Sequence, residues 1–261
     1  MGQLRIATWN VNSLAARMPR VSEWLGAAAP DVLCLQETKA TDAGFPAAAL
    51  EALGYESAAT GDGAYNGVAI LSRVGLENVT SGFAGEPGFP DPERRSIAAT
   101  CAGVRVWSVY VPNGRVPGSP HYDYKLAWLA ALTAAVREQL QTGPALALCG
   151  DFNVAPSDAD VWDPAAFAGS THVTPPEREA ISRLLALGLT DVMPRALKGR
   201  PFTYWDYRAG MFHKGEGMRI DLVLLSAQLA AGVGDAYIDR DARKGTKPSD
   251  HAPVVVDLTV P

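Results

Sequence analysis

Leu146-Ala147-Leu148-Cys149-Gly150-Asp151-Phe152-Asn153 is the stretch of sequence that decides how this chain folds. Its apolar half does not alternate with polar residues, a pattern typical of a strand that is buried on both faces of its sheet. Gly150 allows a close approach of the backbone, and Asp151 and Asn153 follow where the strand ends. The stretch therefore predicts a central strand that presents two polar side chains at one edge of a layered sheet.

The rest of the chain alternates similar apolar runs with amphipathic segments. Apolar residues at helical spacing predict the helices, and the last helix follows a Thr174 cap, with prolines and Glu177 in its first turn. Predicted strands cover Leu4–Thr8, Val32–Gln36, Val68–Ser72, Val104–Val111, Ala145–Cys149, Ile220–Leu225 and Val254–Val260, and predicted helices cover Arg17–Ala28, Tyr124–Leu140 and Pro176–Leu187. This order predicts one α/β layered domain over residues 1–261, with surface loops at Gly82–Arg94 and Val154–Thr174.

Composition narrows the class of protein. The 261 residues are 48% hydrophobic and carry a net charge of −5, which suits a globular enzyme better than a nucleic-acid coat protein with a broad basic surface. Cys34, Cys101 and Cys149 lie in apolar runs and are predicted to be buried, reduced thiols. No run of the sequence reaches the ~20 apolar residues of a membrane helix, and the first residues lack the apolar core of a signal peptide. We expect a soluble, cytoplasmic protein.

Polar residues also follow other predicted strands. Asn10 and Asn12 come after the first strand, where they either form a turn or supply amide groups to a site. Glu37 directly follows a buried run and is either a solvated strand end or a metal ligand. Asp151 and Asn153 are equally compatible with an Asx-turn. Each alternative stays open for a single cluster, but the clusters together indicate one polar site.

The C-terminal part of the chain adds a histidine and a second buried carboxylate. Asp221 lies within an apolar run, so it is predicted to be buried and to need a partner, either an arginine such as Arg219 or a histidine that it orients. Asp250 and His251 stand together in a loop between prolines. Carboxylates with a histidine and no cysteine ligands describe an oxygen-lined site for a hard divalent cation, with acid–base chemistry beside it. This is the equipment of a phosphodiester-cleaving enzyme.

Taken in order, these motifs resemble the exonuclease III family of abasic-site endonucleases, within the endonuclease/exonuclease/phosphatase superfamily. The resemblance extends over essentially the whole chain and rests on Trp9-Asn10-Val11-Asn12, Leu35-Gln36-Glu37-Thr38-Lys39, Tyr110-Val111-Pro112-Asn113-Gly114, Gly150-Asp151-Phe152-Asn153-Val154, Thr203-Tyr204-Trp205-Asp206-Tyr207-Arg208, Arg219-Ile220-Asp221 and Ser249-Asp250-His251. It implies a four-layered α/β sandwich, in which two mixed β-sheets pack face to face with helices outside and the site lies at one end of the sheets.

The resemblance also implies roles for the site residues. Mg²⁺, or alternatively Mn²⁺, would bind Glu37, with further ligands drawn from Asn10, Asn12, Asp151, Asn153 and Asp250. Asp151 would deprotonate the attacking water, with Asn153 fixing that water or a phosphate oxygen, and Asp221 would orient His251 toward the scissile phosphate. Tyr110 would contact the phosphate or the leaving group. Which of Asp151 and His251 removes the proton stays open at this point.

The expected substrate is double-stranded DNA with abasic sites or 3′ ends, cleaved so that 3′-hydroxyl ends remain. The motif around Glu37, the segment Thr174-Pro175-Pro176-Glu177-Arg178 and the aromatic run Phe202–Tyr207 favour this substrate over the lipids of related phosphatases and phosphodiesterases. The second alternative is a non-catalytic nucleic-acid-binding regulator on the same scaffold. We expect a monomer without membrane affinity, whose DNA contacts come from Asn113, Arg115, Tyr204, Trp205, Arg208, Lys214 and Arg219.

Three positions depart from the family pattern. Some relatives have aspartate in place of Asn12, and the neutral amide is a weaker metal ligand. Many have glycine in place of Ser13. Tyr204 stands where relatives often carry tryptophan or phenylalanine. In the family, this aromatic run helps to form the pocket for the sugar that lacks its base. The Tyr204 hydroxyl would therefore make that pocket more polar and affect the balance between abasic-site cleavage and exonuclease action.

Overall fold

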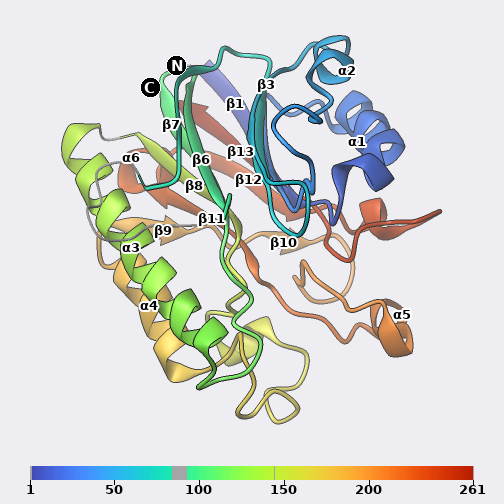
Figure 1. Cartoon of the computed structure of the whole chain (residues 1–261), viewed down its shortest axis with the longest axis vertical. Coiled ribbons are helices and arrows are strands. Elements are labelled where there is room, and N and C mark those ends of the chain that lie inside the picture. The colour runs from blue at the N-terminus through green and yellow to red at the C-terminus, as the bar shows by residue number, and fades with distance from the viewer. Residues whose placement is uncertain (1, 84–92, 144, 261) are drawn as a thin grey trace.

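The computed structural model describes residues 2–83, 93–143 and 145–260, and its strands form two mixed β-sheets (Figure 1). The strands are β1 (Gly2–Asn10), β2 (Val32–Gln36), β3 (Glu56–Thr60), β4 (Val68–Ser72), β5 (Glu77–Ser81), β6 (Ser96–Cys101), β7 (Val104–Tyr110), β8 (Leu146–Asp151), β9 (Leu189–Asp191), β10 (Arg195–Ala196), β11 (Asp221–Ser226), β12 (Val233–Ile238) and β13 (Val254–Val260). One sheet has the order β10-β12-β13-β1-β2-β4-β3, and the other has the order β5-β6-β7-β8-β11-β9. Parallel pairing of β1 with β2 and of β7 with β8 makes both sheets mixed.

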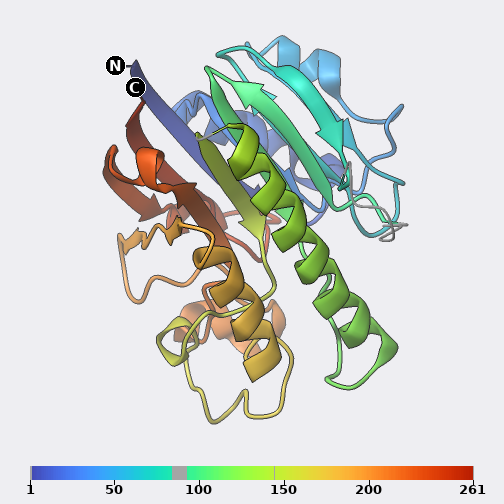
Figure 2. The same cartoon turned by 90° about the vertical axis from the view of Figure 1, so that its left-hand side faces the viewer.

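Helices cover the outer faces of both sheets. The helices of the described residues are α1 (Leu14–Ala28), α2 (Ala47–Glu51), α3 (Pro120–Thr142), α4 (Pro175–Leu185), α5 (Met211–Lys214) and α6 (Ala227–Ala230), with single 3₁₀ turns at Asp158–Asp160, Arg208–Gly210 and Arg240–Arg243. Helices α1 and α2 lie beside the seven-stranded sheet, whereas α3 and α4 lie side by side on the six-stranded sheet (Figures 1 and 2). The predicted four-layered sandwich is therefore confirmed.

The hydrophobic clusters explain why so many strands are continuously apolar. On β2, Val32 and Cys34 point into the core between the sheets, while Leu33 and Leu35 point outward into the cluster that contains Trp24 of α1. On β8, Ala147 and Cys149 point inward, and Leu146 and Leu148 pack toward Trp128 and Leu132 of α3. Because adjacent residues of a strand face opposite sides, a strand between two apolar layers needs an apolar residue at every position.

Predicted elements agree with the structure where the segment is central or strongly amphipathic. The predicted ranges Val32–Gln36, Val68–Ser72 and Val254–Val260 match their strands, and the remaining predicted strands and helices differ from the observed bounds by a few residues. The sequence pattern did not predict β3, β5, β6, β9, β10 and β12, nor α2, α5 and α6. These are short, alanine-rich or polar elements at or near sheet edges, where burial leaves no continuous apolar pattern.

Other expectations have simple outcomes. The thiols of Cys34, Cys101 and Cys149 are free and buried, as predicted. The predicted loop Val154–Thr174 contains only the 3₁₀ turn Asp158–Asp160, whereas the predicted loop Gly82–Arg94 lies largely outside the described residues. Among the described helices, none combines the length and apolar character needed to cross a membrane.

The topology gathers polar strand ends at one place. The parallel pair β1–β2 sets Asn10 opposite Gln36, and Glu37 follows directly. In the other sheet, Asp151 of β8 has Tyr110 of β7 on one side and Asp221 of β11 on the other. Both termini lie together at the start of β1, so Asn10 marks the opposite end of the sandwich (Figure 1). Each sheet thus contributes a row of polar residues to the same end of the molecule.

Candidate active site

A single asparagine links the two sheets at this end. The side-chain nitrogen of Asn10 donates to Oε1 of Glu37 and to Oδ2 of Asp151, both at 2.9 Å. Its side-chain oxygen accepts the backbone N–H of Asn12 at 3.0 Å. Asn10 is fully buried, so both amide hydrogens are committed to carboxylates from different sheets. Its oxygen is engaged by Asn12, and the role of Asn10 as a metal ligand stays a prediction.

Behind Asp151 lies a buried histidine held between two aspartates. The Nδ1 atom of His251 lies 2.8 Å from Oδ2 of Asp221, and its Nε2 atom lies 3.8 Å from Oδ2 of Asp151. Asp221 is buried, as predicted, and its partner is the histidine, not Arg219. The ring of Tyr204 lies 4.9 Å from the imidazole ring, between centroids. One edge of the imidazole is thus oriented by Asp221, and the other faces the catalytic candidate Asp151.

The pKa values of His251 and Asp151 are both raised, but for different reasons. Burial favours neutral imidazole, but the charges of Asp221 and Asp151 outweigh it and raise the pKa of His251 to about 10. Burial raises the pKa of Asp151 to about 7, although the His251 charge and the Asn10 hydrogen bond oppose that shift. At neutral pH the histidine is therefore an imidazolium whose Nδ1–H donates to Asp221 and whose Nε2–H faces Asp151, while Asp151 lies near the midpoint of its titration.

A second group of oxygen atoms surrounds Glu37. Lys39 places its ammonium 3.0 Å from Oε2 of Glu37 and 2.6 Å from the side-chain oxygen of Asn12. The side-chain nitrogen of Asn12 in turn donates to Oδ1 of Asp250 at 3.2 Å. Burial raises the pKa of Glu37, but the Asn10 hydrogen bond and the Lys39 charge outweigh it and lower that pKa overall.

Two places at this end of the sandwich offer metal ligands. The ligand atoms of Asp151, Asp221 and His251 all lie within 4.8 Å of one another, so this cluster could hold a metal ion once His251 has lost its proton. The group at Glu37 needs no such deprotonation, because its carboxylate and amide oxygens are the donors that hard divalent cations prefer. A positive charge already sits between Glu37 and Asn12 in the form of Lys39. The donor set around Glu37 therefore fits Mg²⁺ or Mn²⁺.

Asn153 faces the site from an unusual backbone conformation. Its φ angle of 50° lies in the left-handed region. Its N–H donates to Oδ1 of Asp151 at 2.9 Å, and its side-chain nitrogen donates to the backbone oxygen of Val111 at 2.9 Å. These bonds turn the side-chain oxygen toward Asn113, whose amide lies 3.3 Å away. His172 lies on the other side, with Nδ1 2.5 Å from the backbone oxygen of Asn153.

A cavity of about 250 Å³ opens beside this constellation. Its wall contains Glu37, Lys39, Tyr110 and Arg115, which places the acidic strand ends in contact with cations at a surface opening. Tyr110 is nearly buried, and burial together with the charges of Glu37 and Asp151 raises its pKa. Its hydroxyl therefore stays protonated and available as a donor.

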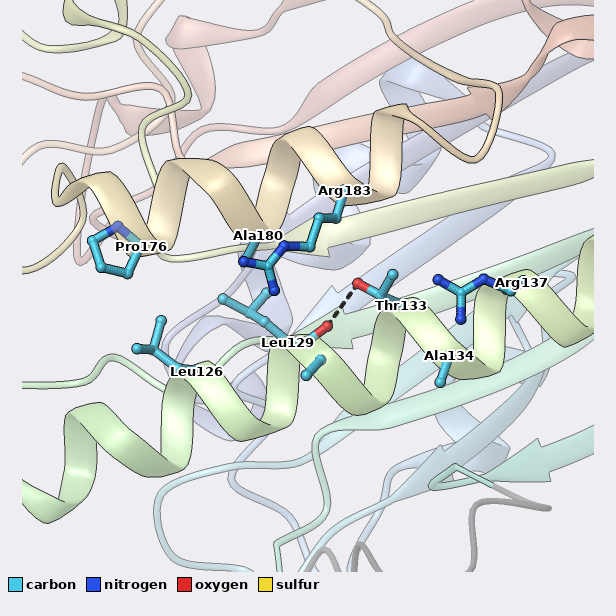
Figure 3. Close-up of a pocket in the computed structure, with 9 residues that line it drawn as sticks. Leu126, Leu129, Thr133, Ala134, Arg137, Pro176, Ala180 and Arg183 are labelled. Carbon is cyan, nitrogen blue, oxygen red and sulfur yellow. Dashed lines mark hydrogen bonds between the residues drawn. The ribbon is translucent and has the colours of Figure 1, made fainter.

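A second groove, of about 290 Å³, lies between α3 and α4 and has a different character (Figure 3). Leu126, Leu129 and Ala180 supply its apolar walls, and Arg137 and Arg183 lie at its rim. The only hydrogen bond between the residues drawn joins the Thr133 hydroxyl to the backbone oxygen of Leu129, within α3. The described residues that line this groove include neither a carboxylate nor a histidine, so we place the chemistry at the strand ends.

Most residues predicted to contact DNA lie at or near the surface of the molecule. Asn113, Arg115, Arg208 and Lys214 are exposed, and Tyr204 is half-buried beside His251. Arg208 forms an ion pair with Asp206, and its own side chain is 87% exposed. These positions are compatible with contact to a large polyanionic ligand.

Two predicted DNA contacts are wrong. Trp205 is 1% exposed and packs in the core, with its ring 5.2 Å from that of Phe212. Arg219 is also 1% exposed, because its guanidinium is enclosed by Asp160 at 2.6 Å and by both oxygens of Asp191. Neither side chain reaches the surface, so neither can touch DNA.

Several residues that shape the site were not predicted as site residues from the sequence. Lys39 lies in the same motif as the predicted ligand Glu37, and His172 lies in a loop without a pattern. Lys125 and Glu177 form an ion pair with no exposed side-chain surface. A signal existed for Lys125, because it stands in helical register with Trp128, Leu129 and Leu132, which are buried. A lysine within such an apolar stripe indicates a buried partner.

Comparison with known proteins places this geometry in context. The model of the endonuclease/exonuclease/phosphatase family matches residues 7–251. An exodeoxyribonuclease of Bacillus subtilis (strain 168) is 33% identical over 98% of this chain and 100% of its own length. The structure of the 3′ phosphatase NExo from Neisseria, bound to a product DNA hairpin, superposes with a TM-score of 0.94 at 44% identity, covering 98% of this chain and 99% of that one. An AP endonuclease from Archaeoglobus fulgidus gives a TM-score of 0.92 at 38% identity, covering 98% and 100% of the two chains.

Proposed function

The chain belongs to the endonuclease/exonuclease/phosphatase family, and from that premise we propose that it is a metal-dependent DNA repair nuclease. It would hydrolyse the phosphodiester 5′ to abasic sites and remove nucleotides from 3′ ends of duplex DNA, leaving 3′-hydroxyl groups. The observation that carries this proposal is the pair of 2.9 Å hydrogen bonds from Asn10 to Glu37 and Asp151. These bonds join the proposed metal ligand, Glu37, to the proposed general base, Asp151, across the two sheets. The relatives named above act as exodeoxyribonuclease, 3′ phosphatase and AP endonuclease, and all three activities break a phosphoester bond of DNA.

Asp151 is the better candidate for the general base. A group with a pKa of about 7 is half deprotonated at neutral pH, whereas His251, with a pKa of about 10, already holds its proton. In the proposed reaction, Asp151 takes a proton from water as the water oxygen bonds to phosphorus. The bond from phosphorus to the 3′ oxygen breaks, and that oxygen leaves with the electron pair and becomes the 3′-hydroxyl after it gains a proton.

The neighbours of Asp151 would stabilise the charge that develops on the phosphate. The imidazolium of His251, oriented by Asp221, would donate Nε2–H to a phosphate oxygen. The side-chain oxygen of Asn153 would accept a hydrogen from the attacking water. Tyr110, kept protonated by burial, would donate to a phosphate oxygen or to the leaving oxygen.

Magnesium fits the oxygen donors around Glu37, with Asn12 and Asp250 as the neighbouring ligands. When bound there, it would neutralise phosphate oxygens and the charge that grows on the leaving 3′ oxygen. The ammonium of Lys39, which contacts both Glu37 and Asn12, would have to move away from them when the ion binds. Asp151 and Asn153, also predicted as ligands, are assigned to the water instead, because a carboxylate with a pKa of about 7 can accept a proton near neutral pH.

Exposed polar and cationic side chains support a nucleic-acid ligand, and two of them, Asn113 and Arg115, line the opening. Asn113, Arg115, Arg208 and Lys214 would contact the phosphate backbone, and Tyr204 would pack against a sugar next to His251. A second candidate activity is removal of a phosphate from a 3′ end. The likeness to a 3′ phosphatase with 44% identity favours it, and the same site would serve for both reactions.

A gel assay with labelled duplex oligonucleotides tests the proposal. One duplex carries an abasic analogue, a second carries a 3′ phosphate, and a third is undamaged with a recessed 3′ end. We expect Mg²⁺-dependent cleavage immediately 5′ to the analogue or trimming from the 3′ ends, and we expect a chelator to abolish it. The Asp151→Asn protein serves as a control for contaminating nucleases. If no duplex is altered at any Mg²⁺ or Mn²⁺ concentration, the proposal fails.

A further inference from the structure

Lys125 carries its charge at a position that solvent does not reach. It lies on α3, and its side chain and that of Glu177 on α4 are both 0% exposed. Their ion pair joins the two helices that lie side by side on the six-stranded sheet (Figure 2). Because both groups are enclosed by protein, neither can touch DNA or metal directly. Any effect on the reaction has to pass through the atoms that they hold.

The ammonium of Lys125 holds the main chain of two loops at the site. In addition to Glu177, its Nζ atom donates to the backbone oxygen of Asn153 at 2.7 Å and to that of Asn113 at 3.2 Å. Gly114, with a φ of 85°, lies so close that a Cβ atom there would come within 2.8 Å of Cδ of Lys125. One buried cation therefore anchors the backbone of both asparagines whose amide groups meet at the opening.

Glu177 extends the anchor to a third loop. Its Oε1 atom accepts the hydroxyl of Thr171 at 2.8 Å and the N–H of His172 at 2.9 Å. Its Oε2 atom accepts the N–H of Thr174 at 3.0 Å and the hydroxyl of the same residue at 2.7 Å, as in a helix capping box. The carboxylate that caps α4 is thus the same one that neutralises Lys125.

The connection to the chemistry runs through Asn153. Its left-handed backbone conformation is uncommon for residues with a side chain, although asparagine adopts it more readily than most, and hydrogen bonds of its N–H and carbonyl groups hold it here. The N–H of this residue bonds Asp151, and its carbonyl bonds Lys125. A change in the tilt of Asn153 would therefore move a donor of Asp151 and the amide oxygen of Asn153 at the same time.

We propose that Lys125, neutralised by Glu177, is a positioning residue for hydrolysis. It fixes the backbone of Asn153, and thereby the direction in which Asp151 and Asn153 face the attacking water. This inference rests on the proposed function. Loss of the ammonium should lower kcat by about 10- to 100-fold, as is usual for groups that orient a catalytic shell, and should leave KM within about threefold.

The test compares four proteins: Lys125→Met, the double variant Lys125→Met/Glu177→Gln, Leu132→Ala and the wild type. Lys125→Met leaves a buried carboxylate without its partner and should lose thermal stability. The double variant removes both charges and should recover much of that stability. Leu132→Ala destabilises the same helix from the apolar core, away from the site loops, and controls for stability alone. For each protein, kcat and KM are measured below its melting temperature, and the exchange of the Asn153 amide hydrogen is followed by NMR without metal.

The positioning role predicts a dissociation of stability from turnover. The double variant should regain its melting temperature but keep the low kcat, and its Asn153 amide should exchange faster than that of Leu132→Ala. The inference is overturned if kcat of the double variant recovers with its stability, or if Leu132→Ala lowers kcat as much. Failure of the proposed function looks different, because the wild-type chain itself would then cleave none of the substrates.

Discussion

Replacing Asp221 by Asn should lower the pKa of His251 and shift the alkaline limit of activity. In the wild-type protein the imidazole lies 2.8 Å from the Asp221 carboxylate, and its pKa is raised to about 10 despite its burial. Opposite unit charges this close attract by about 4 to 6 kcal/mol at an effective dielectric constant of about 20. At about 1.4 kcal/mol for each pKa unit, this corresponds to roughly three to four units. The asparagine oxygen still accepts the Nδ1–H bond and returns part of that energy, so we expect a decrease of about one to three units.

The sign of the pH dependence follows from the state that each group must have. His251 must be protonated to donate Nε2–H, so the wild-type rate should decrease only as pH approaches about 10. Asp151 must be deprotonated to accept a proton, so the rate should increase as pH passes through about 7. Since the Asp221 charge also contributes to the raised pKa of Asp151, both limits should move to lower pH in the variant. From pH 7 to 9 the wild-type rate should about double, whereas a variant whose His251 has a pKa near 8 should lose about 10-fold.

NMR titration of metal-free protein with labelled histidines measures the shift directly. The chain has four histidines, so the resonance of His251 can be assigned by its absence in His251→Gln. The exposed His121 serves as an internal reference, and Asp235→Asn, which removes an exposed partner of Arg195, serves as a control variant. If His251 titrates at the same pH in Asp221→Asn and in the wild type, the electrostatic account of the pair is refuted.

Four further variants address the base, the metal and the predicted DNA contacts. Asp151→Asn should reduce turnover by about 10²- to 10⁴-fold while DNA affinity in a gel-shift assay stays nearly unchanged; near-normal turnover would exclude Asp151 as the base. Glu37→Gln should increase the Mg²⁺ concentration for half-maximal rate, and an unchanged titration curve would remove Glu37 from the ligands. Arg208→Ala should weaken DNA binding and decrease the salt dependence by about one counterion, with the folding free energy unchanged within ~0.5 kcal/mol. Arg219→Ala should instead lose about 3–5 kcal/mol of stability in a denaturant titration, because it leaves Asp160 and Asp191 buried without a cation; a stable variant with weak DNA binding would restore the surface role that burial excludes.

The sequence predicted the central strands because their burial on both faces leaves a readable pattern. β2 and β8 are apolar at every position, whereas the edge strand β3 reads Glu-Ser-Ala-Ala-Thr and carries no such pattern. β6 consists mostly of small residues, and its Ile97, Ala99 and Cys101 are buried by packing against residues of other elements, such as Val68 and Ile70 of β4. Local patterns therefore predicted the centre of each sheet, while tertiary pairing decided the edges.

The site was predictable to the extent that it lies at strand ends. Asp151, Asp221 and Tyr110 are brought together by strand register, which follows from the fold. Side-chain direction is a different matter. Trp205 and Tyr204 are adjacent in sequence, yet one packs in the core and the other beside His251, because successive residues of an extended segment point to opposite sides. An aromatic run alone cannot assign which rings face the ligand.

The structure also gives a reason why Glu37 and Asp151 stay in register, although they lie at the ends of strands in different sheets. Gln36, which precedes Glu37 in the chain, has a buried side chain. Its side-chain nitrogen donates to Thr8 within its own sheet at 3.1 Å and to Ser108 of the opposite sheet at 3.0 Å. The Ser108 hydroxyl donates back to the backbone oxygen of Leu35 at 3.0 Å. These bonds are buried, so a relative slide of the sheets would leave polar groups unsatisfied at a cost of about 1–3 kcal/mol each. Apolar packing alone is less directional than hydrogen bonds. The polar contact between Gln36 and Ser108 therefore sets the relative position of the two sheets, and with it the distance between Glu37 and Asp151 that the side chain of Asn10 bridges.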